Sequence, residues 1–213
     1  MQTTETFRSE VEVTSKLSEL CVTREGLIAC AETAISASAD VTSNHPNNSR
    51  GTYRYHEGTA ALRDLFSGIE GWEKETIDNV ESILNKVLGA RIVFKNVDRA
   101  CSELHLPQPI SPQKSASKRS IQTNSLFEPS AIPLTFAPVK DYGIKTYFFM
   151  VSEKDEEIYA ELSLVTELTH AGSFKGIAER VFIVSPDCYT PIDPKNDELD
   201  ADDNENDFKI SRK

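Results

Sequence analysis

The apolar residues of this chain change their spacing once, and this change limits the fold class more than any other feature. Up to about residue 106 they recur at the three- and four-residue spacing of an α-helix, whereas from residue 131 to residue 186 alternation with polar residues predominates. Helices separated in this way from strands are typical of α+β proteins. We therefore expect a helical N-terminal half followed by a small antiparallel sheet.

Residues 1–106 are predicted to be a helical region with about four to five helices. Ser9 and Glu12 have the spacing of a capping box, which predicts a first helix near residues 5–21. Thr23 would cap a second helix that ends near Asp40. A turn-rich loop follows at residues 43–51, and a short third helix is expected around residues 62–69.

The most regular helical spacing lies in residues 77–88 and predicts a fourth helix. Its apolar positions are Ile77, Val80, Ile83, Leu84, Val87 and Leu88. Gly89 follows at the position where a glycine commonly ends a helix. Residues 92–94 could begin as a strand, but helical spacing returns in residues 97–104 before Pro107 prevents a helix from continuing.

The C-terminal half is expected to contain a linker and a sheet. Residues 107–130 are rich in proline and serine and include a basic run at residues 114–119, so they are predicted to be a basic linker or a long loop. Residues 131–186 form the predicted sheet region, an antiparallel β-meander of about three to four strands. These strands are expected at residues 132–136, 144–151, 158–164 and 177–184, with turns at residues 154–156 and 171–173.

The final region, residues 187–213, is predicted to be a disordered acidic tail. Between Asp193 and Asp207 it contains eight carboxylates and one lysine, so this segment supplies −7 of the net charge of −11. Its apolar residues are too sparse to offset the entropy lost on ordering. The remainder of the chain is therefore only mildly acidic.

Charge and cysteine content exclude several functional classes. A net charge of −11 disfavours direct binding to nucleic acid or to an anionic membrane, so the expected partner is a protein with a basic surface. The four cysteines lie too far apart for a zinc ribbon or a disulfide scaffold and are expected to be buried thiols. Because the chain shows neither a secretory signal nor an apolar run of membrane-spanning length, a cytoplasmic location is predicted.

Motifs that bind phosphate groups, activate a serine nucleophile or hold a catalytic zinc ion are absent from the sequence. The four histidines show no second ligand at helical or hairpin spacing. We therefore expect no cofactor, no metal site and no assigned catalytic residue. This lowers the expectation of an enzyme without excluding one.

The densest mixture of functional side chains is a candidate binding site, made of Tyr53, Arg54, Tyr55, His56 and Glu57. On a loop, the arginine could bind an anion, the tyrosines could stack on a ligand and the histidine could carry a proton. Alternatively, this segment is a strand-like entry to the third helix, in which the tyrosines pack and the glutamate lies near the helix N-terminus.

Two sets of carboxylates were candidates for contact with a partner or a metal. An acidic run in the region of the fourth helix could contact a basic partner, although it equally resembles the solvent face of an amphipathic helix. Its members are Glu70, Glu73, Glu75, Asp78 and Glu81. Glu161 and Glu179 lie on neighbouring predicted strands and could face each other, but exposed strand glutamates are the ordinary explanation.

These observations favour a non-enzymatic protein-interaction module, an adaptor or an inhibitor. Its partner would be a basic, possibly nucleic-acid-binding, protein. The alternative is an enzyme or a small-ligand-binding protein whose site is centred on residues 53–57.

Overall fold

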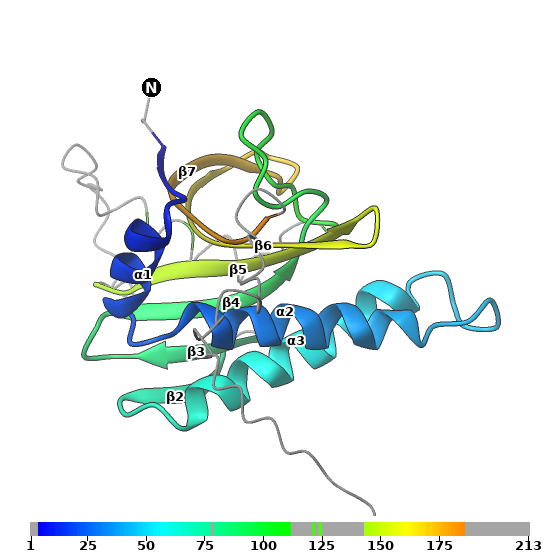
Figure 1. Ribbon diagram of the computed structural model, residues 1–213, viewed down its shortest axis with the longest axis horizontal. Helices are drawn as coiled ribbons and strands as arrows, with labels where there is room; N and C mark the ends of the chain where they lie inside the picture. Colours follow the sequence, from blue (N-terminus) through cyan, green and yellow to red (C-terminus); the bar gives the residue numbers. More distant parts are fainter. Residues whose placement is uncertain (1–3, 78, 112–120, 122–123, 125–142, 186–213) are drawn as a thin grey trace, which may run out of the picture.

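The computed structural model describes residues 4–77, 79–111, 121, 124 and 143–185, which form three N-terminal helices and a seven-stranded mixed sheet (Figure 1). The α+β class predicted from the sequence is confirmed, and the arrangement of the strands differs from the prediction. The predicted strand at residues 132–136 and the acidic tail at residues 187–213 lie outside the described residues.

Three helices follow a short first strand, β1 (Glu5–Phe7), so the first helix is shorter than the predicted range of residues 5–21. They are α1 (Glu10–Ser18), α2 (Arg24–Ala39) and α3 (Ser49–Ser67). The predicted capping box begins α1, since Ser9 accepts a hydrogen bond from the Glu12 amide and the Glu12 side chain accepts one from the Ser9 amide. Thr23 caps α2 in the same manner, through the amide of Gly26.

The sheet has the order β1-β7-β6-β5-β4-β3-β2. Its remaining strands are β2 (Trp72–Ile77), β3 (Val80–Asn85), β4 (Ala90–Asn96), β5 (Lys145–Lys154), β6 (Glu157–Leu168) and β7 (Phe174–Val184). β1 runs parallel to β7 and β4 runs parallel to β5, whereas the other neighbours are antiparallel. The expected small antiparallel sheet is therefore one half of a larger mixed sheet.

The predicted fourth helix is wrong, because Ile77 ends β2 and residues 80–85 form β3, the two strands of a β-hairpin. Ile77 pairs with Val80, which leaves two residues for the turn between β2 and β3, and Asn79 in this turn has a φ of 62°. A spacing of three between apolar residues fits a helix, but it also places two residues opposite each other across a two-residue turn. Gly89, with a φ of 61°, ends the next turn rather than a helix.

The strand expected to begin at residues 92–94 is confirmed as part of β4. The returning helix predicted for residues 97–104 is wrong, because these residues belong to an irregular loop. The predicted short third helix is the C-terminal part of α3, which begins at Ser49. The region 1–106 therefore contains three helices and the first four strands, rather than four to five helices.

The predicted antiparallel meander is confirmed in β5, β6 and β7. Asp155 and Glu156 form the turn between β5 and β6 with φ values of 53° and 65°, and Gly172 at 86° lies in the next turn. Of the described residues in the predicted linker, Pro107, Ile121 and Asn124 are buried, whereas Ile110 is exposed. Asn124 bonds the backbone of Thr146 and the carbonyl of Val165.

Two apolar clusters cover the two faces of the sheet. On one face, α1, α2 and α3 pack on the sheet through residues that include Leu17, Leu27, Phe66, Phe94 and Phe149. Figure 1 shows α2 and α3 crossing this face together. On the other face, Val97 and Ala100 of the loop pack against strand residues such as Phe148 and Met150. None of the described helices is long and apolar enough to cross a membrane.

Candidate functional site

The five residues of the sequence-predicted site lie in the middle of α3, neither on a loop nor on a strand-like segment. Successive residues of a helix point about 100° apart, so the five side chains diverge. Tyr53 and Glu57 are exposed, Arg54 is buried, and Tyr55 and His56 line a groove beside the β2–β3 hairpin. The structure thus keeps only two of the five residues together.

Arg54 has a structural position. Its Nη2 atom lies 2.6 Å from a carboxylate oxygen of Glu153 on β5 and 3.0 Å from the hydroxyl of Ser38 on α2. Burial lowers the pKa of Arg54, and Glu153 opposes this effect. The arginine therefore joins α3, α2 and the end of β5, and is not presented to an external anion.

The groove between α3 and the β2–β3 hairpin has a volume of about 510 Å³. One face of α3 supplies most of its lining, and the hairpin supplies the remainder. The lining residues are Tyr55, His56, Thr59, Ala60, Arg63, Asp64, Lys74, Asn79 and Glu81. We call this feature the α3–hairpin groove.

The strand pattern explains why the groove exists. Trp72 and Ile83 belong to the apolar cluster under the helices, and the ring of Phe66 on α3 lies 4.5 Å from that of Trp72. Farther along β2, the residues that alternate with Trp72 on the same side are Lys74 and Thr76. Because these side chains are polar, the apolar contact between helix and hairpin ends there.

Arg63 and Glu81 form a fixed pair inside the groove. Arg63 forms an ion pair with Glu81 and also donates to the carbonyl of Glu75 and the hydroxyl of Thr76. The hydrogen bond from Thr76, together with the nearby Arg63, holds the pKa of Glu81 below its ordinary value. Glu81 is therefore a carboxylate at neutral pH, and Arg63 is tied to the hairpin.

Asp64 and Lys74 form a looser pair at the same groove. The Lys74 ammonium lies 3.6 Å from an Asp64 carboxylate oxygen, and the two side chains are 56% and 78% exposed, respectively. Exposed pairs of this type contribute little to stability. These two groups are therefore available to solvent and to a ligand.

Tyr55 provides the aromatic part of the groove. Its ring lies 6.4 Å from that of Phe94 on β4, and burial, followed by the charge of Glu81, raises the pKa of its phenol. Tyr55 is therefore a neutral hydroxyl at physiological pH. The combined lining suits hydrogen bonding and charge recognition.

The acidic run does not form one helix face, so that expectation is wrong. Glu73 pairs with Lys86, Glu81 pairs with Arg63, and Glu75 pairs with Arg91. Arg91 is 3% exposed at the side chain, and its Nε atom lies 2.6 Å from Glu75. Glu70 is exposed, and Asp78 lies outside the described residues. Among the four members of this set that the structure describes, only Glu81 lines the groove.

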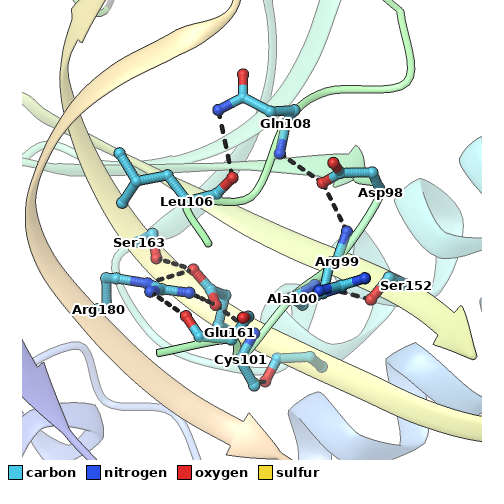
Figure 2. A network of polar contacts seen from close by, with 12 residues as sticks. Asp98, Arg99, Ala100, Cys101, Leu106, Gln108, Ser152, Glu161, Ser163 and Arg180 are labelled. Carbon is cyan, nitrogen blue, oxygen red and sulfur yellow. Dashed lines mark hydrogen bonds and ion pairs between the residues drawn. The ribbon is translucent and has the colours of Figure 1, made fainter. Parts of the chain in front are cut away.

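A second polar cluster lies on the other face of the sheet (Figure 2). Glu161 is fully buried, contrary to the expectation of an exposed strand residue, and it pairs with Arg180 at 2.6 Å. Glu179 points to the opposite side of β7, where it contacts Tyr147, Lys16 and Lys145. Glu161 and Glu179 therefore do not form a common site.

The Glu161 cluster holds the loop of residues 97–111 on the sheet. The Cys101 amide donates to Glu161 at 2.6 Å, and Arg180 donates to the carbonyl of Ser102 at 2.7 Å (Figure 2). Ser163 supplies another donor to the Glu161 carboxylate. Because the ion pair is buried and is hydrogen-bonded to the loop, it anchors the loop to the sheet.

The cysteines differ from one another in exposure. Cys30 is buried and Cys101 is partly buried, but Cys21 is exposed, so the expectation of buried thiols fails for Cys21. Burial raises the pKa of Cys30 to about 11. Cys188 lies outside the described residues. Within the part of the chain that the structure describes, no three His, Cys, Asp or Glu side chains are grouped to hold a metal ion.

Comparison with known proteins gave no match: no protein-family model, curated protein or solved structure is similar to this chain. The evidence on function therefore comes from the residues and geometry of the α3–hairpin groove.

Proposed function

We propose that this protein is a non-catalytic interaction protein, an adaptor or inhibitor, which binds a basic segment of a partner protein at the α3–hairpin groove. The observation that carries the proposal is an open groove of about 510 Å³ within an acidic stretch of the chain. From residue 55 to residue 81 the sequence has seven carboxylates and two cations, and two of these carboxylates, Glu73 and Glu75, pair with Lys86 and Arg91. The remaining excess of negative charge around the groove attracts a positively charged segment.

The fixed Glu81 and the exposed Asp64 provide two carboxylates at different positions in this groove. Tyr55 adds a half-buried aromatic hydroxyl between helix and sheet. A lysine or arginine side chain could therefore find charge, a hydrogen-bond partner and an aromatic surface in one place. We identify the partner by this chemistry, as a basic and possibly nucleic-acid-binding protein.

A small polar ligand is a second candidate, because a volume of about 510 Å³ lies within the range of small-molecule sites. In that case His56 and Tyr55 would contribute to recognition, as the sequence predicted for residues 53–57. A small-ligand site does not require a basic peptide to bind there, so peptide binding that depends on Asp64 favours the first candidate.

The test measures binding of a short peptide of alternating lysine and alanine to the full chain. Asp64→Asn should weaken binding about fivefold, since one charge contact in water is worth about 1 kcal/mol. Glu32→Gln is the matched control, because Glu32 is an exposed helical carboxylate of α2 that does not line the groove. Both variants change the net charge equally.

Binding should also weaken as salt concentration rises, and hydrogen exchange should show protection in α3 and β2. If Asp64→Asn and Glu32→Gln weaken binding equally, the peptide responds only to net charge and the proposed site is wrong. The proposal is also contradicted if Asp64→Asn weakens peptide binding but the peptide does not protect α3 and β2 of the wild type from hydrogen exchange.

A further inference from the structure

The two cations of the α3–hairpin groove differ in how firmly they are held. Arg63 has a side chain that is 20% exposed, and it contacts Glu81, the Glu75 carbonyl and the Thr76 hydroxyl. Lys74 is 56% exposed, and its ion-pair partner in the described structure is Asp64, at 3.6 Å. Removing Arg63 would disrupt the packing of α3 on the hairpin, whereas Lys74 can leave Asp64 at little cost.

Lys74 also determines the charge that an incoming ligand meets. With histidine neutral, the lining carries two positive charges, on Arg63 and Lys74, and two negative charges, on Asp64 and Glu81. The groove is therefore neutral as it stands, although the surrounding chain is acidic. If Lys74 turns away, the lining becomes negative and Asp64 has no cation beside it.

We propose that Lys74 is an intrachain competitor of the partner: its ammonium occupies the place beside Asp64 that a lysine or arginine of the basic segment takes on binding. This inference rests on the function proposed above. It assigns a regulatory role to a residue of the same groove. The partner's cation replaces the Lys74–Asp64 pair with an equivalent pair and releases Lys74 to solvent.

The consequence is that removal of the Lys74 charge should strengthen binding. Lys74→Gln should lower the Kd for the lysine–alanine peptide about threefold to fivefold, because the peptide no longer displaces a cation and meets a negative groove. Lys74→Arg should leave the affinity close to that of the wild type, since it preserves the competing charge.

Lys86→Gln is the matched control. Lys86 directly follows β3. Like Lys74, it pairs with an exposed carboxylate, in this case Glu73, but it does not line the groove. It produces the same change in net charge, so it should alter the Kd much less than Lys74→Gln does. Thermal unfolding midpoints of all variants should agree within a few degrees, because both lysines are exposed.

A double-mutant cycle decides the mechanism. In the Asp64→Asn background, Lys74→Gln should strengthen binding no more than Lys86→Gln does, because the position for which the two cations compete has been removed and only the change in net charge remains. If Lys74→Gln has no effect, weakens binding, or acts equally with and without Asp64, the inference is wrong. If Asp64→Asn itself matches the Glu32→Gln control, the proposed function is wrong as well, so the two failures are distinguishable.

Discussion

Two ion pairs of this protein use the same chemistry in opposite surroundings. The Glu161–Arg180 pair has side chains that are 0% and 4% exposed, whereas the Asp64–Lys74 pair has side chains that are 78% and 56% exposed. The buried pair is bonded to Ser163, to the Cys101 amide and to the Ser102 carbonyl. The exposed pair has room to exchange its partners.

This difference in exposure determines how much each ion pair contributes to the stability of the fold. A buried charge that loses its partner is strongly destabilising, so the Glu161 cluster has to remain intact and can hold a loop in place. An exposed pair contributes between about 0 and 1 kcal/mol, so it can open at low cost when another cation arrives. The first pair therefore anchors the loop, and the second pair is suited to the recognition that we propose.

The largest expected effect tests the anchor. Glu161→Gln should lower the free energy of unfolding by about 3–5 kcal/mol, because it leaves Arg180 charged and buried without its carboxylate. Glu167→Gln on the same strand is the control, since its pair with Lys175 is exposed and should contribute less than about 1 kcal/mol. Chemical denaturation measures both, and equal losses would remove the distinction between the two kinds of pair.

Lys95 provides an intermediate case, a largely buried charge with no ion-pair partner among the described residues. Burial lowers its pKa to about 8, below the value of about 10.4 expected in the unfolded chain. The unfolded state therefore binds more protons between these pH values, so the contribution of Lys95 to stability rises as pH increases through this window.

The test compares the wild type with Lys95→Met in denaturant at pH 7 to 10. The variant should be more stable by up to about 3 kcal/mol at pH 7, and the difference should shrink as pH approaches 10. If the difference in the free energy of unfolding between the two proteins does not change with pH, burial does not disfavour the charged form of Lys95.

A smaller effect tests how α3, which carries most of the groove, is held against the sheet. A β-carbon at Gly58 would overlap the ring of the fully buried Phe94. Gly58→Ala should therefore destabilise the protein by about 1–3 kcal/mol despite the better helix propensity of alanine. It should also reduce peptide binding, because α3 must move relative to the hairpin.

Gly51→Ala is the control in the same helix, since a β-carbon there has no neighbour within 4 Å. It should leave stability unchanged or raise it by up to about 1 kcal/mol. If Gly58→Ala and Gly51→Ala have the same effect on thermal unfolding, then the close approach of α3 to β4 at Gly58 does not determine the position of the groove.

The smallest expected effect concerns the exposed pair itself. Asp64→Asn and Lys74→Gln should each change the free energy of unfolding by less than about 1 kcal/mol, because both side chains are mainly in solvent. Denaturation in urea provides the measurement. A loss comparable to that of Glu161→Gln would mean that this pair is also structural and would remove the basis for assigning it to recognition.

Parts of the fold could be predicted because their signals are local. Ser9 with Glu12 and Thr23 with Gly26 form caps from residues three positions apart, and both helix starts follow from them. Strands β5 to β7 were predictable because their apolar alternation is interrupted by turn residues such as Asp155 and Gly172.

The hairpin was missed because its apolar residues satisfy two patterns. Ile77 and Val80 fit one face of a helix, but they also pair across a two-residue turn. The available signal was the pair of turn-forming residues Asp78-Asn79 between the β-branched residues Ile77 and Val80, which has the length of a hairpin turn. Helical spacing likewise places Tyr55, Thr59 and Arg63 near one another, which would have suggested part of the groove.

The sequence by itself determined the α+β class, two helix starts, the C-terminal meander and the uneven distribution of charge. Tertiary structure decided that residues 72–77, 80–85 and 90–96 are strands, that Glu161 is a buried anchor and that Asp64 and Lys74 meet across the groove. The physical reason is that caps and turns depend on residues close in the chain, whereas strand pairing, burial and ion pairs between elements depend on residues that only the fold brings together.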